Sequence, residues 1–136
     1  MKVLVDTNVI LDVALRRDPF FGESARVLEA AGSGGVLLFV TATTITDLYY
    51  IIRKARGSED ALEFVRDLLG IFDVAGVDRL VILDALDRGL ADFEDAVQCA
   101  AAEQGNISTV VTRNEADFAS SGLSVQSPAA FLEAMR

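Results

Sequence analysis

The first ten residues constrain the fold more than any other segment. The apolar run at residues 3–5 has the character of a buried strand and stops at Asp6, and an apolar helical pattern begins two residues later. A continuous apolar run recurs at residues 36–40, and a third strong strand is predicted at 107–112, with helical patterns between them. Because such runs are typical of strands covered on both faces, the sequence predicts a parallel sheet with helices on each side.

The remaining segments alternate in the same way, which predicts a single α/β domain over residues 1–136 with a mostly parallel sheet of four to five strands. Weaker strands are predicted at 72–77 and around Val125. Helices are predicted up to about residue 15, then at 20–31, from Thr43 or Thr44 to 56, at 58–69 and 79–87, from Asp92 to 104, and from Pro128 onward. Thr7 or Asn8 is the expected cap of the first helix, and Ser58 and Asp78 are expected to cap two others.

Composition excludes several classes of site. The sequence contains no histidine, which removes Ser-His-Asp triads, histidine general bases and histidine-containing zinc sites. A single cysteine, Cys99, excludes an internal disulfide and multi-cysteine metal sites. Any metal must therefore bind oxygen ligands, which favours Mg²⁺ or Mn²⁺.

The same inventory bears on location and partners. No apolar run approaches the length of about 18 residues that a membrane span needs, and no signal-peptide pattern is visible, so we expect a cytoplasmic protein without a membrane partner. The net charge of −9 argues against a nucleic-acid partner. Ten arginines remain for local phosphate contacts, however, and a bound cation would neutralise clustered carboxylates.

Four acidic segments follow strands or open the next helix, and each also has an ordinary structural explanation. Asp6 ends the first strand but would also serve as a helix cap. Asp47 lies in an apolar helix, where it could simply face solvent. Asp92 and Asp95 open a helix, where acids interact favourably with the helix dipole. Asp117 follows the 107–112 strand in what could be an ordinary loop.

Taken together, these acids predict a cation site. A parallel sheet brings the carboxyl ends of its strands to one edge, which is where ligands bind in open α/β sheets. Carboxylates gathered there repel one another and raise each other's pKa values unless a cation intervenes.

The ordered set of motifs resembles the PIN-domain family, and within it the small VapC-type toxins of bacterial toxin–antitoxin pairs. The resemblance rests on Val5-Asp6-Thr7-Asn8-Val9, Thr46-Asp47, Asp92-Phe93-Glu94-Asp95-Ala96 and Thr112-Arg113-Asn114 with Asp117-Phe118. It implies a three-layer α/β/α fold, Mg²⁺- or Mn²⁺-dependent cleavage of RNA, a homodimer and an antitoxin protein as partner.

The resemblance also implies roles for individual residues. Asp6, Asp95 and Asp117 match acidic ligands of the family, and Asp47 stands where the family usually has glutamate, one methylene longer. Thr7, Asn8 and Thr112 match polar residues that support the site, and Asp92 and Asn114 match less closely. Arg113 is a candidate phosphate contact beside these residues.

The resulting hypothesis is hydrolysis of RNA phosphodiester bonds, with metal ions held by Asp6, Asp47, Asp95 and Asp117. A phosphotransfer domain is a weaker alternative, since such domains need a lysine late in the chain and none follows Lys54. A PIN-like binding module without nuclease activity is the other alternative, because Asp47 departs from the family pattern and the chain is acidic.

Overall fold

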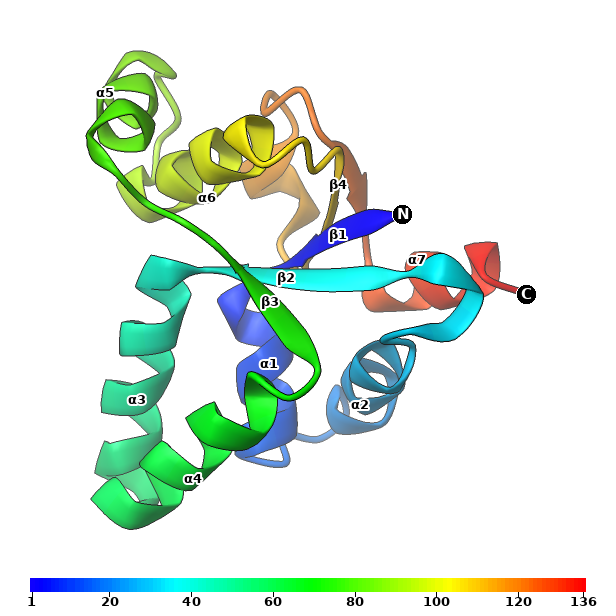
Figure 1. Ribbon diagram of the computed structural model, residues 1–136. Helices are drawn as coiled ribbons and strands as arrows, with labels where there is room; N and C mark the ends of the chain where they lie inside the picture. The colour runs from blue at the N-terminus through cyan, green and yellow to red at the C-terminus, as the bar shows by residue number, and fades with distance from the viewer.

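The computed structural model describes all 136 residues as a three-layer α/β/α domain built on a five-stranded sheet (Figure 1). The strands lie in the order β3-β2-β1-β4-β5, and every neighbouring pair is parallel. Their bounds are β1 (Lys2–Val5), β2 (Leu37–Thr41), β3 (Phe72–Ala75), β4 (Thr109–Val111) and β5 (Ser124–Gln126). The predicted α/β class and parallel sheet are therefore confirmed.

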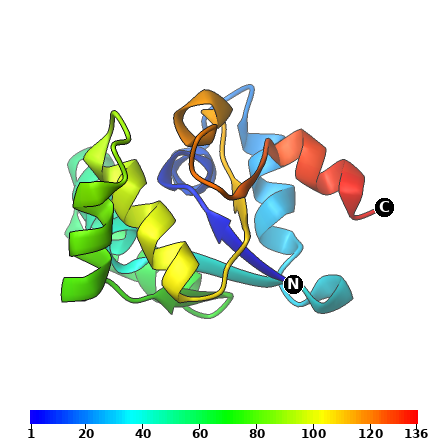
Figure 2. The same cartoon turned by 90° about the horizontal axis from the view of Figure 1, so that it is seen from above.

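Seven α-helices connect the strands and cover both faces of the sheet. They are α1 (Thr7–Ala14), α2 (Phe21–Glu29), α3 (Ala42–Arg56), α4 (Ser58–Leu68), α5 (Arg79–Asp87), α6 (Phe93–Gln104) and α7 (Pro128–Ala134). Two short 3₁₀ helices, η1 (Ser33–Gly35) and η2 (Glu115–Phe118), lie in the loops. Helices α5 and α6 pack side by side over one face, while α1 to α4 and α7 lie on the other (Figures 1 and 2).

The alternation of side chains along β1 explains the two cores. Val3 and Val5 belong to the core shared with α1 to α4 and α7, and Leu4 belongs to the core under α5 and α6. All three side chains are fully buried. The central strand is therefore apolar on both faces, as its continuous run predicted.

Two strands are shorter than predicted because the flanking residues have no neighbouring strand with which to pair. β3 ends at Ala75, which pairs with Thr41, and beyond Thr41 the neighbouring chain turns into α3. The strand expected at 107–112 is confined to β4 because the N–H of Ile107 donates to the carbonyl of Ala102 in the turn that ends α6. Ile107 is buried there all the same.

Three predicted helix caps were also wrong, each because the helix starts earlier than the pattern suggested. Asp6 rather than Thr7 or Asn8 caps α1, and Thr41 rather than Thr43 or Thr44 caps α3. Gly57 precedes α4, which begins at Ser58 itself. In each case the chain enters the helix almost directly, without the extra turn residues assumed from the sequence. Asp78 and Asp92 are caps as predicted.

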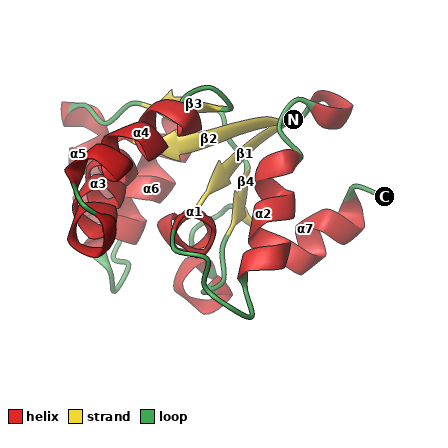
Figure 3. Ribbon diagram, turned by 90° about the horizontal axis from the view of Figure 1, so that it is seen from below, coloured by secondary structure: helices red, strands yellow, loops and turns green.

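The carboxyl ends of the parallel strands point toward one edge of the sheet, as the arrowheads of β1 and β2 show in Figure 3. Helices α1 and α3 start at that edge, directly after β1 and β2. The loop after β4 leads into η2 there as well. The fold thus places three of the four acidic segments of the sequence at the ends of adjacent strands.

Candidate metal centre

Asp6 is the anchor of this edge, where it is 6% exposed and joins three parts of the chain. Its Oδ1 accepts hydrogen bonds from the N–H of Thr7 at 2.7 Å and from Nε2 of Gln98 at 3.0 Å. Its Oδ2 accepts one from Oγ1 of Thr112 at 2.8 Å. Asp6 therefore both caps α1 and lies at the candidate site. The same oxygen, Oδ1, accepts from the first turn of α1 and from Gln98 of α6.

A chain of threonine hydroxyls links the starts of α1 and α3. Oγ1 of Thr7 lies 3.0 Å from Oγ1 of Thr44, which lies 3.0 Å from Oγ1 of Thr41. Thr41 and Thr44 are fully buried. This contact fixes α3 beside Asp6 and places Asp47, one turn along α3 and half-buried, toward the start of α6.

The first turn of α6 contains the two carboxyl groups whose pKa values are raised, those of Glu94 and Asp95. Asp92 caps the helix, and its Oδ1 accepts from the N–H of Asp95 at 3.0 Å. A hydrogen bond with Asp47 raises the pKa of Glu94 to about 8, with burial and the charges of Asp47, Asp92 and Asp6 adding to the effect. Burial raises the pKa of Asp95 to about 7, and the charges of Asp6, Asp92 and Asp117 raise it further.

The sequence spacing of Phe93, Ala96, Val97 and Ala100 predicts a buried stripe on α6, and the structure confirms it only in part. Ala96, Val97 and Ala100 are buried as predicted, but Phe93 is 50% exposed. Phe93 is the first residue of α6, directly after the cap Asp92, and its side chain stands clear of the core.

The loop after β4 completes the site. Thr112 is fully buried, and its Oγ1 accepts from the N–H of Asn114 at 2.9 Å while donating to Asp6. Asp117 is exposed on η2, and its N–H donates to the carbonyl of Asn114 at 3.0 Å. Asn8 accepts from the N–H of Arg113 at 3.4 Å, so α1 also contacts this loop.

Arg113 lies beside the acids but is already paired. Its Nε and Nη2 donate to Oδ2 and Oδ1 of Asp12 at 2.6 and 3.1 Å. Its guanidinium carbon lies 3.9 Å from the centre of the Phe20 ring. Nη1 makes no hydrogen bond within the protein, so it is the part of Arg113 that remains for a phosphate contact.

We call the six carboxylates linked by these effects the acidic cluster: Asp6, Asp47, Asp92, Glu94, Asp95 and Asp117. The donor chemistry fits a divalent cation, because all six offer hard oxygen ligands and their charges act on one another. No three acidic or cysteine side chains, however, already converge closely enough to form a metal-binding group. The carboxylates of the cluster therefore lie close enough to affect one another's pKa values, but no three of them lie within ligand distance of a common point.

Sequence reasoning missed three residues that contribute to this region: Gln98, Asp12 and Glu94. Gln98 and Asp12 are buried polar side chains within otherwise apolar helical runs, and in the sequence the helix dipole alone accounts for Glu94 in the first turn of its helix. The signal that could have found the first two is the one used for Asp47, since a polar residue among apolar ones needs a partner. Oε1 of Gln98 is buried without a hydrogen-bond partner next to Asp6.

Residues 2–116 of the sequence match the family described as PIN domain, which covers most of the chain. The chain belongs to the PIN-domain family. The match takes in five members of the acidic cluster and ends one residue before Asp117. No curated protein matches this PIN domain in sequence.

Several solved structures share the fold of this PIN domain. FitAcB from Neisseria gonorrhoeae has a TM-score of 0.71 at 21% identity, covering 93% of this chain and 98% of that one. A toxin–antitoxin complex from Klebsiella pneumoniae has a TM-score of 0.70 at 22% identity, covering 93% and 97%. VapC20 of Mycobacterium tuberculosis, described as a toxin that cleaves the sarcin-ricin loop, has a TM-score of 0.65 at 15% identity, covering 79% and 86%.

No helix of this PIN domain combines the length and the apolar character that crossing a bilayer demands.

Proposed function

We propose that this PIN domain is a divalent-metal-dependent endoribonuclease that hydrolyses phosphodiester bonds in RNA. The observation that carries the proposal is the acidic cluster. Burial and the neighbouring carboxylates raise the pKa of Asp95 to about 7, and Asp47, together with burial, raises that of Glu94 to about 8. Uncompensated carboxylates so close together destabilise the folded state, and a cation would relieve the repulsion. Groups with strongly perturbed pKa values gather at functional sites more often than elsewhere.

Asp6, Asp47, Asp95 and Asp117 are the residues that would hold Mg²⁺ or Mn²⁺. A divalent ion bound there supplies a water of lowered pKa as nucleophile and stabilises charge on the phosphate oxygens. No protein side chain has to act as a general base, which suits a chain without histidine.

The surrounding residues hold the carboxylates in position. Thr112 and Gln98 donate to Asp6 from the loop after β4 and from α6, so its orientation is set before any ion binds. Asp47, which stands where the family usually has glutamate, raises the pKa of Glu94, so the two carboxyls act directly on each other. Arg113 offers Nη1 to a substrate phosphate, with Thr7, Asn8, Asp92 and Asn114 as supporting residues.

RNA cleavage by the purified protein tests this proposal. We expect cleavage with added Mg²⁺ or Mn²⁺ and none in EDTA, and loss of cleavage in Asp95→Asn. Glu29→Gln, an exposed change on α2 outside the cluster, is the matched control and should cleave like wild type. Equal cleavage by the Asp95→Asn variant would contradict the assignment.

We further propose that the protein is the cytoplasmic toxin of a type II toxin–antitoxin pair, acts as a homodimer and is held in check by an antitoxin protein. The similar folds of the Klebsiella pneumoniae toxin–antitoxin complex and of the toxin VapC20 support a toxin of this kind. Exposed apolar side chains on α3 and α5, among them Tyr50, Leu80 and Leu86, support a protein partner. Co-expression with the protein encoded by a neighbouring gene, followed by a growth assay, tests this part.

A second candidate is a PIN-like binding module with a weak metal site. It is favoured by one observation, that no three carboxylates converge at ligand distance. Calorimetric titration with Mn²⁺ separates the two, because a module without a functional site should show little specific heat of binding.

A further inference from the structure

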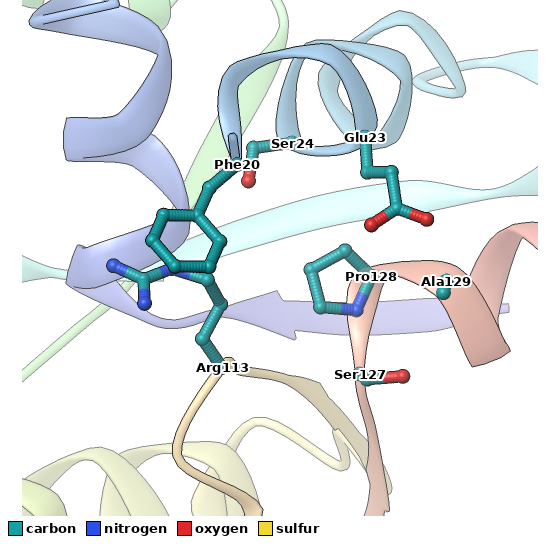
Figure 4. A pocket seen from close by; sticks show the side chains of 7 residues that line it. All are labelled: Phe20, Glu23, Ser24, Arg113, Ser127, Pro128 and Ala129. Atoms are coloured by element: carbon teal, nitrogen blue, oxygen red, sulfur yellow. The ribbon is translucent and has the colours of Figure 1, made fainter. Parts of the chain in front are cut away.

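A pocket of about 380 Å³ lies at the same edge of the sheet as the acidic cluster, outside the carboxyl ends of β4 and β5. Its walls are formed by residues from the start of α2, the loop after β4 and the start of α7. They include Phe20, Glu23, Ser24, Arg113, Ser127 and Pro128 (Figure 4). Arg113 directly follows Thr112, which binds Asp6, so the pocket and the acidic cluster are connected through the loop after β4.

One wall of the pocket is flat and held rigidly. The guanidinium of Arg113 stacks on the Phe20 ring, with 3.9 Å between the guanidinium carbon and the ring centre. Asp12 fixes the plane of the guanidinium through two hydrogen bonds, at 2.6 and 3.1 Å. Oγ of Ser24 donates to Oδ2 of Asp12 at 3.1 Å, so the carboxylate is itself held. The wall therefore needs no reordering to receive a planar ligand.

The charges of the pocket disfavour a phosphate inside it, as distinct from a phosphate contact with the unpaired Nη1 of Arg113. The fully buried carboxylate of Asp12 neutralises Arg113, and Glu23 adds a negative charge on the opposite side, as Figure 4 shows. A neutral planar group that stacks on Phe20 and donates N–H groups to Glu23 suits these walls better. Single-stranded RNA presents such groups as unstacked bases, which stack on aromatic rings and arginine planes.

We propose that this pocket accepts an unstacked nucleobase of the RNA substrate beside the bond that is cut, with guanine preferred. Guanine offers two adjacent N–H donors, N1–H and the N2 amino group, which one carboxylate accepts together. The proposal rests on the proposed ribonuclease function for the identity of the ligand. Phe20 supplies stacking, Glu23 selects the base, and Asp12 positions Arg113.

Binding of the dinucleotides GpU and IpU to the ¹⁵N-labelled protein in EDTA tests the subsite without cleavage. Inosine lacks only the N2 amino group. We expect GpU to shift the amide resonances of Ser24, Ser127 and Ala129 and to bind roughly ten-fold more tightly than IpU. Phe20→Leu should weaken binding of both roughly ten-fold, because a stacking face is lost.

Glu23→Gln should remove the difference between GpU and IpU, whereas Glu29→Gln, on the same helix but outside the pocket, should keep it. Equal affinity of wild type for GpU and IpU, resonance shifts confined to other surfaces, or no binding at all would overturn the proposal. Binding is measured in EDTA, without divalent ions, and is therefore independent of the cleavage assay with added Mg²⁺ or Mn²⁺. Specific binding in the pocket by a protein that does not cleave RNA would refute only the nuclease function. Cleavage without binding in the pocket would refute only the subsite.

Discussion

The carboxylate of Asp12 is fully buried, and its only cationic partner is Arg113, whose Nε lies 2.6 Å from Oδ2. The two residues are 101 positions apart in the chain. Their contact ties α1 to the loop that carries Asn114 and Asp117. One ion pair therefore couples the first helix to the last member of the acidic cluster.

Breaking this ion pair should destabilise the fold. In Asp12→Asn the guanidinium of Arg113, which is 24% exposed, loses its charged partner. Removal of one member of a buried pair usually costs several kcal/mol, and we expect a loss of about 3 kcal/mol in the free energy of unfolding. Urea denaturation measures the change.

The exposed ion pair between Arg136 and Glu133 is the matched control, with 3.6 Å between Nε and Oε2. Glu133→Gln should change the free energy of unfolding by less than about 0.5 kcal/mol, because water screens this pair. Equal changes in the free energy of unfolding for the two substitutions would show that the buried ion pair contributes no more to stability than the exposed one.

Thr112→Val should impair both stability and activity. The substitution keeps the shape of the side chain but removes the hydroxyl that donates to Asp6 and accepts from Asn114. We expect a loss of about 2 kcal/mol, since a buried carboxylate loses a donor and an N–H loses its acceptor. Thermal or urea unfolding measures it, with Thr46→Val on the exposed side of α3 as the control. A neutral Thr112→Val variant would contradict this role.

Stability of the metal-free protein should fall as the pH rises from about 5 to about 8. Asp95 and Glu94 have pKa values of about 7 and 8 in the folded protein, against ordinary values of 3.8 and 4.5. Between these limits the folded state keeps protons that the unfolded state has released, so raising the pH favours unfolding.

Thermal unfolding in EDTA across this pH range checks that prediction. Glu94→Gln should flatten the profile because it removes one of the two titrating groups, and Mg²⁺ should stabilise wild type more at the upper end of the range. A wild-type profile that rises with pH, or one that Glu94→Gln leaves unchanged, would show that the pKa shifts have another origin.

The sequence was sufficient to predict the parallel sheet, because the apolar runs around Leu4, Leu38 and Val110 report burial on both faces directly. It also predicted that Asp6 lies at the carboxyl edge of the sheet, because Asp6 directly follows β1. Asp95 opens α6, which follows α5 rather than a strand, so its place beside Asp6 depends on how α6 packs. The sequence could not predict how close the carboxylates come, because that depends on side-chain rotation within the first turns of α3 and α6.

Long-range polar pairings were harder to foresee. Nothing in the local pattern says that Asp12 binds Arg113, or that Gln98 binds Asp6 across 92 positions. Periodicity locates a buried polar side chain, but only the packing of separate elements assigns its partner. The prediction that Phe93 is buried is wrong for a different reason. Phe93 is the first residue of α6, and an apolar residue at the first position of a helix need not face the core.

Calorimetric titration of the purified protein with Mn²⁺ tests the central claim, that the acidic cluster holds a divalent cation. We expect saturable heat of binding in wild type and its loss in Asp95→Asn, with release of protons on binding at about pH 7 because Asp95 and Glu94 are partly protonated there. Glu29→Gln should bind like wild type. No saturable heat in wild type, or the same heat in Asp95→Asn, would contradict the account.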